Sequence, residues 1–259
     1  MFVGAQLSVV VPMFNEARAL PVTLGKLSRT FSENDVEFVL VDDGSIDDSA
    51  GLAEHLTHGD DRFEVVRLPK NLGKGAALRA GIARTTADSV LFMDADLSTS
   101  LDEIDDFLEK LNDYDIVIGS RSVPGAVVNR SNALRTLMGR SFNRIMRIAT
   151  GLAVRDSQCG FKAFRGDVGR LLFALSESNR FAFDPEVLRI GTALGYSITE
   201  IPVVWIASDH SAVRPLRDSL HTAADLIPIR MRTRTKRIEG LASRSGLPIP
   251  APAHRSTDH

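Results

Sequence analysis

The sequence predicts an α/β fold, in which a mostly parallel β-sheet carries helices on both faces. Two observations lead to this prediction. Short apolar runs rich in β-branched residues recur through the first half of the chain, and segments with helical patterns separate them. The run at residues 7–11, LSVVV, is also a continuous β-branched run, which is typical of a strand that is buried on both faces.

Five strands are predicted in the first half, at residues 7–11, 36–41, 63–68, 89–93 and 115–119. The first, with the sequence LSVVV, is expected to end at Pro12. Helices are predicted between the strands, at about residues 16–30, 47–56, 75–83 and 101–111. Strands and helices that alternate in this way form parallel sheets, because each helix returns the chain to the start of the next strand.

The second half has a different pattern. A long helix is predicted at residues 132–149, followed by an extended segment at 160–164, a helix at 185–194 and a strand pair at 198–205. We expect one α/β domain over residues 1–214 and an amphipathic, basic helix over residues 215–238. Residues 239–259, which are rich in Pro, Ser and Ala, are expected to form a disordered tail.

Composition narrows the class of protein. The chain has 259 residues, of which 44% are hydrophobic and 25% charged, as expected for a soluble globular core. The net charge of -2 argues against nucleic-acid binding through a basic surface. The one cysteine, Cys159, excludes an internal disulfide and suits a reducing cytoplasm. No run of about 18 apolar residues and no signal peptide are found, so we expect a cytoplasmic protein that meets a membrane only from the side.

Polar side chains follow four of the predicted strands. The strand ends read PMFNE from Pro12, DDGS from Asp42, DAD from Asp94 and GSR from Gly119. Ligands of open parallel sheets bind outside the carboxyl ends of the strands. Carboxylates gathered there repel one another unless a cation or a ligand rich in donors lies among them. Each Asp, Asn or Ser alone has another explanation as a helix N-cap, but the four strand ends together favour a shared site.

Asp94-Ala95-Asp96 is the strongest single element. Two carboxylates separated by one small residue at a strand end can reach one divalent cation, and Mg²⁺ or Mn²⁺ takes such oxygen ligands together with substrate phosphates. The cation would neutralise a leaving diphosphate. The alternative is a capping Asp beside a solvated Asp.

The segment NLGKGA, from Asn71 to Ala76, has neither the spacing of a P-loop nor that of a dinucleotide-binding turn. It predicts a turn at which the backbone around Gly73 and the Lys74 side chain approach an anionic ligand at the start of a helix. A plain glycine-containing turn is the alternative.

These turns, in this order, resemble the family 2 glycosyltransferases, which have the GT-A fold, a Rossmann-like α/β architecture. VPMFNE, VDDGSIDDS, NLGKGAAL and DADLS are similar to four successive blocks of that family, and the resemblance extends over roughly residues 7–230. GSR, DSQCGFK and RFAFD further resemble the branch that glycosylates polyprenyl phosphates, and CGFKAF and RFAFDPEVL are closer to its glucosyl type.

The resemblance implies an inverting enzyme that moves glucose or an N-acetylhexosamine from a UDP-sugar to a polyprenyl phosphate of the dolichyl type. It also implies Mg²⁺ or Mn²⁺ as cofactor. GDP-mannose as donor and a non-catalytic subunit that binds sugar nucleotides are the alternatives. An acceptor phosphate is already an anionic nucleophile, so catalysis would come from positioning and electrostatic stabilisation.

The resemblance also assigns roles to residues. The residues implied to hold the nucleotide sugar are Pro12, Asn15, Glu16, Asp42, Asp43, Gly73, Lys74, Asp94 and Ala95. Metal ligands would be Asp94 and Asp96, with Ser98 as a shorter, weaker ligand where relatives have a longer one. Arg121 and Arg135 match arginines that face phosphate, and Lys162 and Arg214 are further candidates for the same pocket. Asp156 would act as a base or orient a partner, and the alternative is a salt bridge to Arg155, Lys162 or another cation.

Membrane contact is predicted at residues 215–237. Apolar residues recur there at helical spacing, and a basic cluster follows, formed by Arg230, Arg232, Arg234, Lys236 and Arg237. This combination suits an interfacial helix against anionic lipid on the cytoplasmic face, alone or with a separate membrane-anchoring subunit. The alternative is a helix packed on the domain with a solvated basic end. Cys159 and Trp205 are predicted to be packed side chains.

Overall fold

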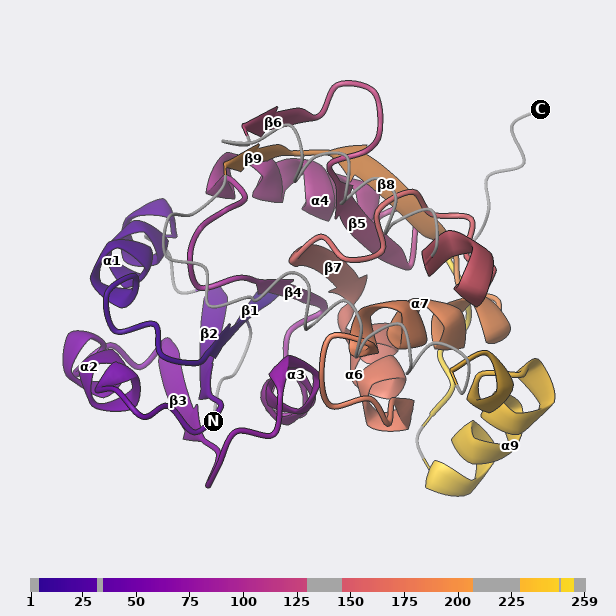
Figure 1. Ribbon diagram of the computed structural model, residues 1–259, viewed down its shortest axis with the longest axis horizontal. Coiled ribbons are helices and arrows are strands. Elements are labelled where there is room, and N and C mark those ends of the chain that lie inside the picture. The colour runs from indigo at the N-terminus through magenta and orange to yellow at the C-terminus, as the bar shows by residue number, and fades with distance from the viewer. Residues whose placement is uncertain (1–4, 32–34, 130–145, 207–228, 247, 254–259) are drawn as a thin grey trace.

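The computed structural model describes residues 5–31, 35–129, 146–206, 229–246 and 248–253, and every structural statement below concerns these residues. Seven strands form one sheet in the order β3-β2-β1-β4-β7-β5-β8 (Figure 1). Their bounds are Phe63–Arg67, Val36–Asp42, Leu7–Met13, Ser89–Met93, Phe161–Arg165, Ile116–Ser120 and Ile198–Pro202, in that order across the sheet. All neighbours are parallel except at β7, which runs antiparallel to both β4 and β5. The predicted mostly parallel α/β sheet is therefore confirmed.

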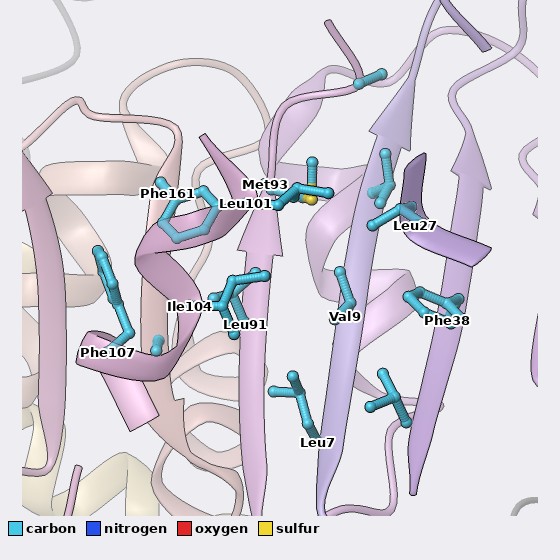
Figure 2. Close-up of a cluster of buried hydrophobic side chains, with 14 of the residues drawn as sticks. Leu7, Val9, Leu27, Phe38, Leu91, Met93, Leu101, Ile104, Phe107 and Phe161 are labelled. Carbon is cyan, nitrogen blue, oxygen red and sulfur yellow. The ribbon is translucent and has the colours of Figure 1, made fainter. Parts of the chain in front are cut away.

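Helices cover both faces of the sheet, as predicted. One face packs against α1 (Leu20–Thr30), α2 (Ser49–Leu56) and α4 (Ile104–Lys110), the last preceded by the short 3₁₀ turn η1 (Leu101–Glu103). The other face packs against α3 (Lys74–Ile82), α6 (Gly166–Leu175) and α7 (Phe183–Ala193). Because successive side chains of a strand point to opposite faces, Val9 and Val11 of β1 lie in the first core and Val10 in the second. Figure 2 shows the first core, where Leu27 of α1 and Phe107 of α4 lie over the sheet whose strands carry Val9 and Phe38.

The extended segment predicted at residues 160–164 is β7, and it occupies a central place in the sheet. It inserts between β4 and β5 and pairs with both. Phe161 lies opposite Met93 of β4, and Phe164 lies opposite Ile116 of β5. Because β7 is antiparallel, it begins at the edge where β4 and β5 end. The loop before β7, including residues 156–160, therefore lies beside the carboxyl ends of the parallel strands.

The two strands predicted at residues 198–205 are present, but each belongs to a different sheet. β8 joins the main sheet beside β5, whereas β9 (Val204–Ile206) pairs in parallel with β6 (Val127–Asn129). Residue Thr99, just after the Asp94-Ala95-Asp96 turn, forms a single antiparallel bridge with Trp205. This small second sheet, called the β6–β9 sheet below, is thereby attached to the loop that follows β4.

Two predicted boundaries differ from the structure. Pro12 lies within β1, which continues to Met13; β4 pairs with β1 only as far as Val10, so on that side no ladder bond is lost at the proline. The first helix begins at Leu20 rather than near residue 16, because the backbone first turns through Asn15, whose φ is 59°.

The predicted disordered tail also differs over its first part. Residues 235–245 form α9 (Thr235–Ser245), which packs on α6 and α7 with Ile238 and Ala242 buried. Residues 250–253 then bind the sheet end opposite the strand carboxyl ends, where Ala253 N donates to Asp115 Oδ1 at 2.8 Å and Tyr196 Oη donates to Pro250 O at 3.0 Å. The buried Asp115 carboxylate supplies a partner that composition could not reveal. Residues 132–145 and 215–228 lie outside the described residues, as does the boundary at 214.

None of the helices in the described ranges is both long enough and apolar enough to cross a bilayer.

Candidate active site

The turns after β1 and β2 are bound to each other by hydrogen bonds. Asn15 N donates to Ser45 Oγ at 2.9 Å, and Asn15 Oδ1 accepts from Ile46 N at 2.9 Å. Glu16 N donates to Ser49 Oγ at 2.8 Å. Asn is one of the few residues that tolerates the positive φ found at position 15, which explains its use in this turn. Asn15 and Glu16 are thereby fixed at the strand edge, and Pro12 precedes the last residue of β1, Met13.

Asp42 and Asp43 are both buried but differ in their partners. Asp43 Oδ1 and Oδ2 accept from Leu72 N and Gly73 N, each at 2.8 Å. Burial raises the pKa of Asp43 against the opposing effect of these two amides. Asp42 Oδ2 accepts from Ser45 N at 3.2 Å, whereas Asp42 Oδ1 is buried and has no hydrogen-bond partner within the described residues. Of the two carboxylates, Asp42 therefore retains the acceptor that a nucleoside could use.

The NLGKG turn requires both of its glycines. Gly73 has a φ of 105°, and a Cβ at Gly73 or Gly75 would overlap the backbone of residues 178–179. The turn delivers Lys74 to the first position of α3, where its Nζ makes an ion pair with Asp94 Oδ1. Burial alone would lower the pKa of Lys74, but the Asp94 and Asp184 carboxylates outweigh it and raise the pKa. Lys74 therefore stays cationic beside the first Asp of the DAD turn.

The DAD turn is held on three sides. Asp94 N donates to Gly160 O at 3.1 Å, and a Cβ on Gly160 would overlap the Asp94 carboxylate. Ala95 is buried, and its carbonyl accepts from Thr23 Oγ1 at 2.5 Å. Asp96 Oδ1 accepts from Ser98 N at 3.0 Å. Ser98 is 7% exposed and its amide fixes Asp96, and its role as a third metal ligand stays a prediction.

Within the described residues, several carboxylates lie close to Glu16 at this edge. Burial, and then the charges of Asp96, Asp94 and Asp47, raise the pKa of Glu16 to about 7. Within the described residues, no group of three or more His, Cys, Asp or Glu side chains forms a complete metal-binding cage. Asp94 and Asp96 still fit Mg²⁺ or Mn²⁺, because such ions usually take one or two carboxylates and leave other positions to phosphates and water. In the structure, the positive charge beside Asp94 comes from the Lys74 ammonium.

Arg121 follows β5 at the same edge and is held by Asp156. Its Nε and Nη2 donate to Asp156 Oδ2 and Oδ1 at 2.7 and 2.9 Å, and its backbone N donates to Oδ2 at 3.0 Å. Burial alone would raise the pKa of Asp156, but the Arg121 guanidinium outweighs it and lowers the pKa to about 2. Asp156 therefore orients Arg121, and this depressed pKa makes it a poor general base near neutral pH. Of the predicted alternatives for Asp156, the described residues show an ion pair with another cation, Arg121, and the charge of Lys162 also lowers the pKa of Asp156.

Lys162 does not reach this edge as a free cation. Its side chain is 2% exposed, its Nζ makes an ion pair with Asp184 Oδ1, and the same Nζ donates to Cys159 O at 2.5 Å. Burial also raises the pKa of the Cys159 thiol to about 11, in agreement with a packed cysteine. Arg135 and Arg214 lie outside the described residues.

Comparison with known proteins assigns the family. The sequence profile of Glycosyl transferase family 2 matches residues 8–170, which is more than half of the chain. The chain belongs to glycosyl transferase family 2. It is 33% identical to a dolichyl-phosphate beta-glucosyltransferase of Trichomonas vaginalis over 85% of this chain and 69% of that protein. It is 32% identical to the human dolichyl-phosphate beta-glucosyltransferase over 88% of this chain and 75% of that protein.

Solved structures share the fold of this chain. Glucosyl-3-phosphoglycerate synthase from Mycobacterium tuberculosis, in complex with Mn²⁺, UDP and phosphoglyceric acid, superposes with a TM-score of 0.62 at 22% identity. The match covers 95% of this chain and 80% of that structure. The predicted GT-A fold is confirmed, and the chain is a glycosyltransferase.

Three features of this family 2 enzyme were missed by sequence reasoning. Gly160 allows the close approach of the loop to Asp94, Asp184 neutralises Lys162, and the Trp205 ring lies 5.5 Å from the Arg121 guanidinium. Gly160 lies in the CGFK segment and Asp184 in the RFAFD segment, and both segments were noted in the sequence. Their contacts with Asp94 and Lys162 could not be predicted from the sequence. Trp205 gave no signal, because the link between β9 and the site depends on an isolated bridge to Thr99.

Proposed function

We propose that this glycosyltransferase moves glucose from UDP-glucose to a polyprenyl phosphate of the dolichyl type, with inversion at the sugar carbon. The two curated relatives described above support the substrate class, since both are dolichyl-phosphate beta-glucosyltransferases aligned over most of this chain. The observation that carries the proposal is the placement of two centres for anions at one sheet edge. Asp94 and Asp96 follow β4, Arg121 follows β5, and the charge of Asp94 acts on Arg121.

The donor is assigned to the side of β1, β2 and β4. Asn15, Glu16 and Asp42 Oδ1, which has no hydrogen-bond partner in the described residues, offer polar partners to a nucleoside, and Pro12 in β1 is proposed to contribute to the same site. Asp43 and Gly73 support this side through the backbone of the NLGKG turn, and Lys74 offers a cation to the diphosphate. Ala95 is proposed to support the site by fixing the backbone of the DAD turn, since its side chain packs in the core and its carbonyl accepts from Thr23. Mg²⁺ or Mn²⁺ held by Asp94 and Asp96 would stabilise the charge that builds up on the departing UDP.

The acceptor is assigned to the side of β5. Arg121 presents a guanidinium that Asp156 fixes by two parallel hydrogen bonds. Its Nη1 donates no hydrogen bond within the described part of the chain and is the group proposed to bind the acceptor phosphate. A phosphate oxygen attacks the sugar carbon from the face opposite UDP, a carbon–oxygen bond forms, and the bond to UDP breaks. Since the nucleophile is an anion, no strong base is needed. Arg135 and Arg214 are proposed to contribute to this acceptor pocket. Ser98 is proposed to contribute to the metal shell.

Peripheral contact with the cytoplasmic face of a membrane is part of the proposal. Met231 is 58% exposed, and Arg230, Arg234 and Lys236 are exposed beside it, as an anionic lipid surface requires. Arg232 and Arg237 contribute less, because each lies 3.4 Å from a Glu177 carboxylate oxygen. A separate membrane-anchoring subunit would serve the same purpose.

A donor panel tests the proposed reaction. The protein is incubated with Mg²⁺ or Mn²⁺, a polyprenyl phosphate and labelled UDP-glucose, UDP-N-acetylglucosamine or GDP-mannose, and lipid product is extracted into butanol. Label from UDP-glucose in an alkali-stable, acid-labile glycolipid is expected. A preference for GDP-mannose would overturn the donor assignment. Tight UDP binding without product from any donor would favour a binding subunit instead.

A further inference from the structure

The β6–β9 sheet contacts both halves of the proposed site. Ile206 N donates to Ser98 O at 2.8 Å, and Ser100 N donates to Val204 O at 3.3 Å, so β9 is bonded to the loop after the DAD turn. Val204 N also donates to Glu103 Oε1 at 3.1 Å. The sheet is therefore fixed to the donor side through β9, while the Trp205 ring contacts Arg121 on the acceptor side.

The two faces of the β6–β9 sheet differ in what they contact. Trp205 is paired with Val128, and both are half-buried. Because side chains alternate along a strand, the residues on either side of Trp205 point the other way. That outer face carries Val127 at 58% exposure, Val204 at 37% and Ile206 at 56%, and the register places Val127 beside Val204.

These three exposed side chains form a cluster and are not scattered over the surface. Nine large hydrophobic side chains are exposed in the described residues, and three of them lie on this one short sheet. Single exposed apolar residues are normal on protein surfaces, whereas a local group beside a functional site indicates a ligand or partner.

We propose that the outer face of the β6–β9 sheet, formed by Val127, Val204 and Ile206, binds the isoprenoid chain of the acceptor next to its phosphate. This inference rests on the proposed function. The occupant is identified by the chemistry of the two faces. Arg121 beside Trp205 suits a phosphate, and the opposite face of the same strands suits an apolar chain attached to it. A soluble phosphorylated acceptor would gain nothing from this face.

Acceptors of two lengths test the proposal. Val127 and Ile206 are replaced together by Thr, which keeps the β-branch that the strands favour but removes apolar surface. The KM for a long-chain polyprenyl phosphate in detergent is expected to rise about tenfold, because two apolar side chains lose their contact with the chain. The KM values for water-soluble citronellyl phosphate and for UDP-glucose are expected to stay within about twofold. The control is Val22→Thr on α1, since Val22 is also 58% exposed.

Fluorescence gives a second readout that needs no turnover. Trp205 is the only tryptophan in the chain, so its emission reports directly on the β6–β9 sheet. Long-chain polyprenyl phosphate should change the emission in a saturable manner in the wild type and in V22T. The V127T/I206T variant should need about tenfold more lipid.

The outcomes are distinguishable. Equal KM values of wild type and V127T/I206T for the long-chain acceptor would overturn the inference while leaving the proposed function intact. A KM that rises equally for both acceptors would also overturn it, since the effect would then lie at the phosphate. A wild type that glucosylates neither lipid, and whose Trp205 emission ignores polyprenyl phosphate, would overturn the proposed function as well.

Discussion

Burial and the nearby carboxylates raise the pKa of Glu16 to about 7. This raised pKa has a consequence for the stability of the folded state. Unfolded, the carboxyl has a pKa of 4.5, so the folded state binds the proton more tightly between these two values. The unfolding free energy therefore falls as the pH rises from 4.5 to 7 and is flat above. Below pH 4.5 Glu16 is protonated in both the folded and the unfolded state, so its contribution to the unfolding free energy is at its full value there.

Glu16→Gln should remove this dependence. The unfolding free energy of E16Q minus that of the wild type should increase between pH 5 and pH 8 by about 1 kcal/mol, a value discounted for solvent screening. Urea unfolding in EDTA at the two pH values measures it. Glu239→Gln, an exposed change on α9, is the control and should follow the wild type. A difference that stays constant with pH would show that neither burial nor the neighbouring carboxylates raise the pKa of Glu16 in the folded state.

Arg121→Lys tests the acceptor side at the scale of one residue. Lysine cannot reproduce the two parallel bonds to the buried Asp156, so the KM for the acceptor should rise about 10- to 100-fold. UDP binding by calorimetry should be unchanged. Arg67→Lys is a matched control, because Arg67 makes the same two bonds to Glu54 at 2.8 and 2.6 Å but on the surface. Weakened UDP binding in R121K, with an unchanged acceptor KM, would contradict the assignment of Arg121.

At this scale, sequence reasoning located the polar residues but not their partners. Strand ends can be recognised locally, so Asn15, Asp42 and Asp94 were found by their position after apolar runs. The ion pairs Arg121–Asp156 and Lys162–Asp184 join residues 35 and 22 positions apart. Their geometry depends on the insertion of β7, which no local pattern encodes.

Among the elements, the loop before β7 has the most direct effect on the metal site. Gly160→Ala would push the Asp94 carboxylate, so Mn²⁺ and UDP should bind at least about tenfold more weakly in calorimetry. Gly240→Ala on α9 meets open space and should instead raise stability by about 0.5–1 kcal/mol. Normal Mn²⁺ and UDP binding by G160A would mean that Asp94 is not held as described.

The segment after α9 is expected to stabilise the domain. Removing residues 248–259 takes away Ala253 N from Asp115 and Ala251 O from Arg165, leaving a buried carboxylate with fewer partners. The unfolding free energy should fall by about 1–3 kcal/mol. Removing only residues 254–259 is the control in the same urea titration. Equal stability of the two truncated proteins would support the disorder predicted from composition.

Elements were predictable where hydrophobic periodicity was long and local. The strands β1 to β5 and the helices between them follow from apolar runs and turns. The place of β7 in the sheet and the binding of residues 250–253 depend on pairing with distant strands, and the Pro- and Ser-rich composition of the tail pointed to disorder instead.

For the whole molecule, the sheet topology explains why donor and acceptor meet. Parallel β1, β2, β4 and β5 end at one edge, and antiparallel β7 begins there, so the loop carrying Asp156 and Gly160 joins the two sides. The fold class and this edge were predictable from alternating strands and helices. The central claim is that one metal-dependent site at this edge moves glucose from UDP-glucose to a lipid phosphate.

The most direct test follows labelled glucose from UDP-glucose into polyprenyl phosphate after removal of divalent cations and again after Mn²⁺ is added back. Product should be absent without metal, return with Mn²⁺, and fall at least about 1,000-fold in Asp96→Asn, with Asp102→Asn on the neighbouring turn close to wild type. Metal-independent product, or full activity in D96N, would contradict the account.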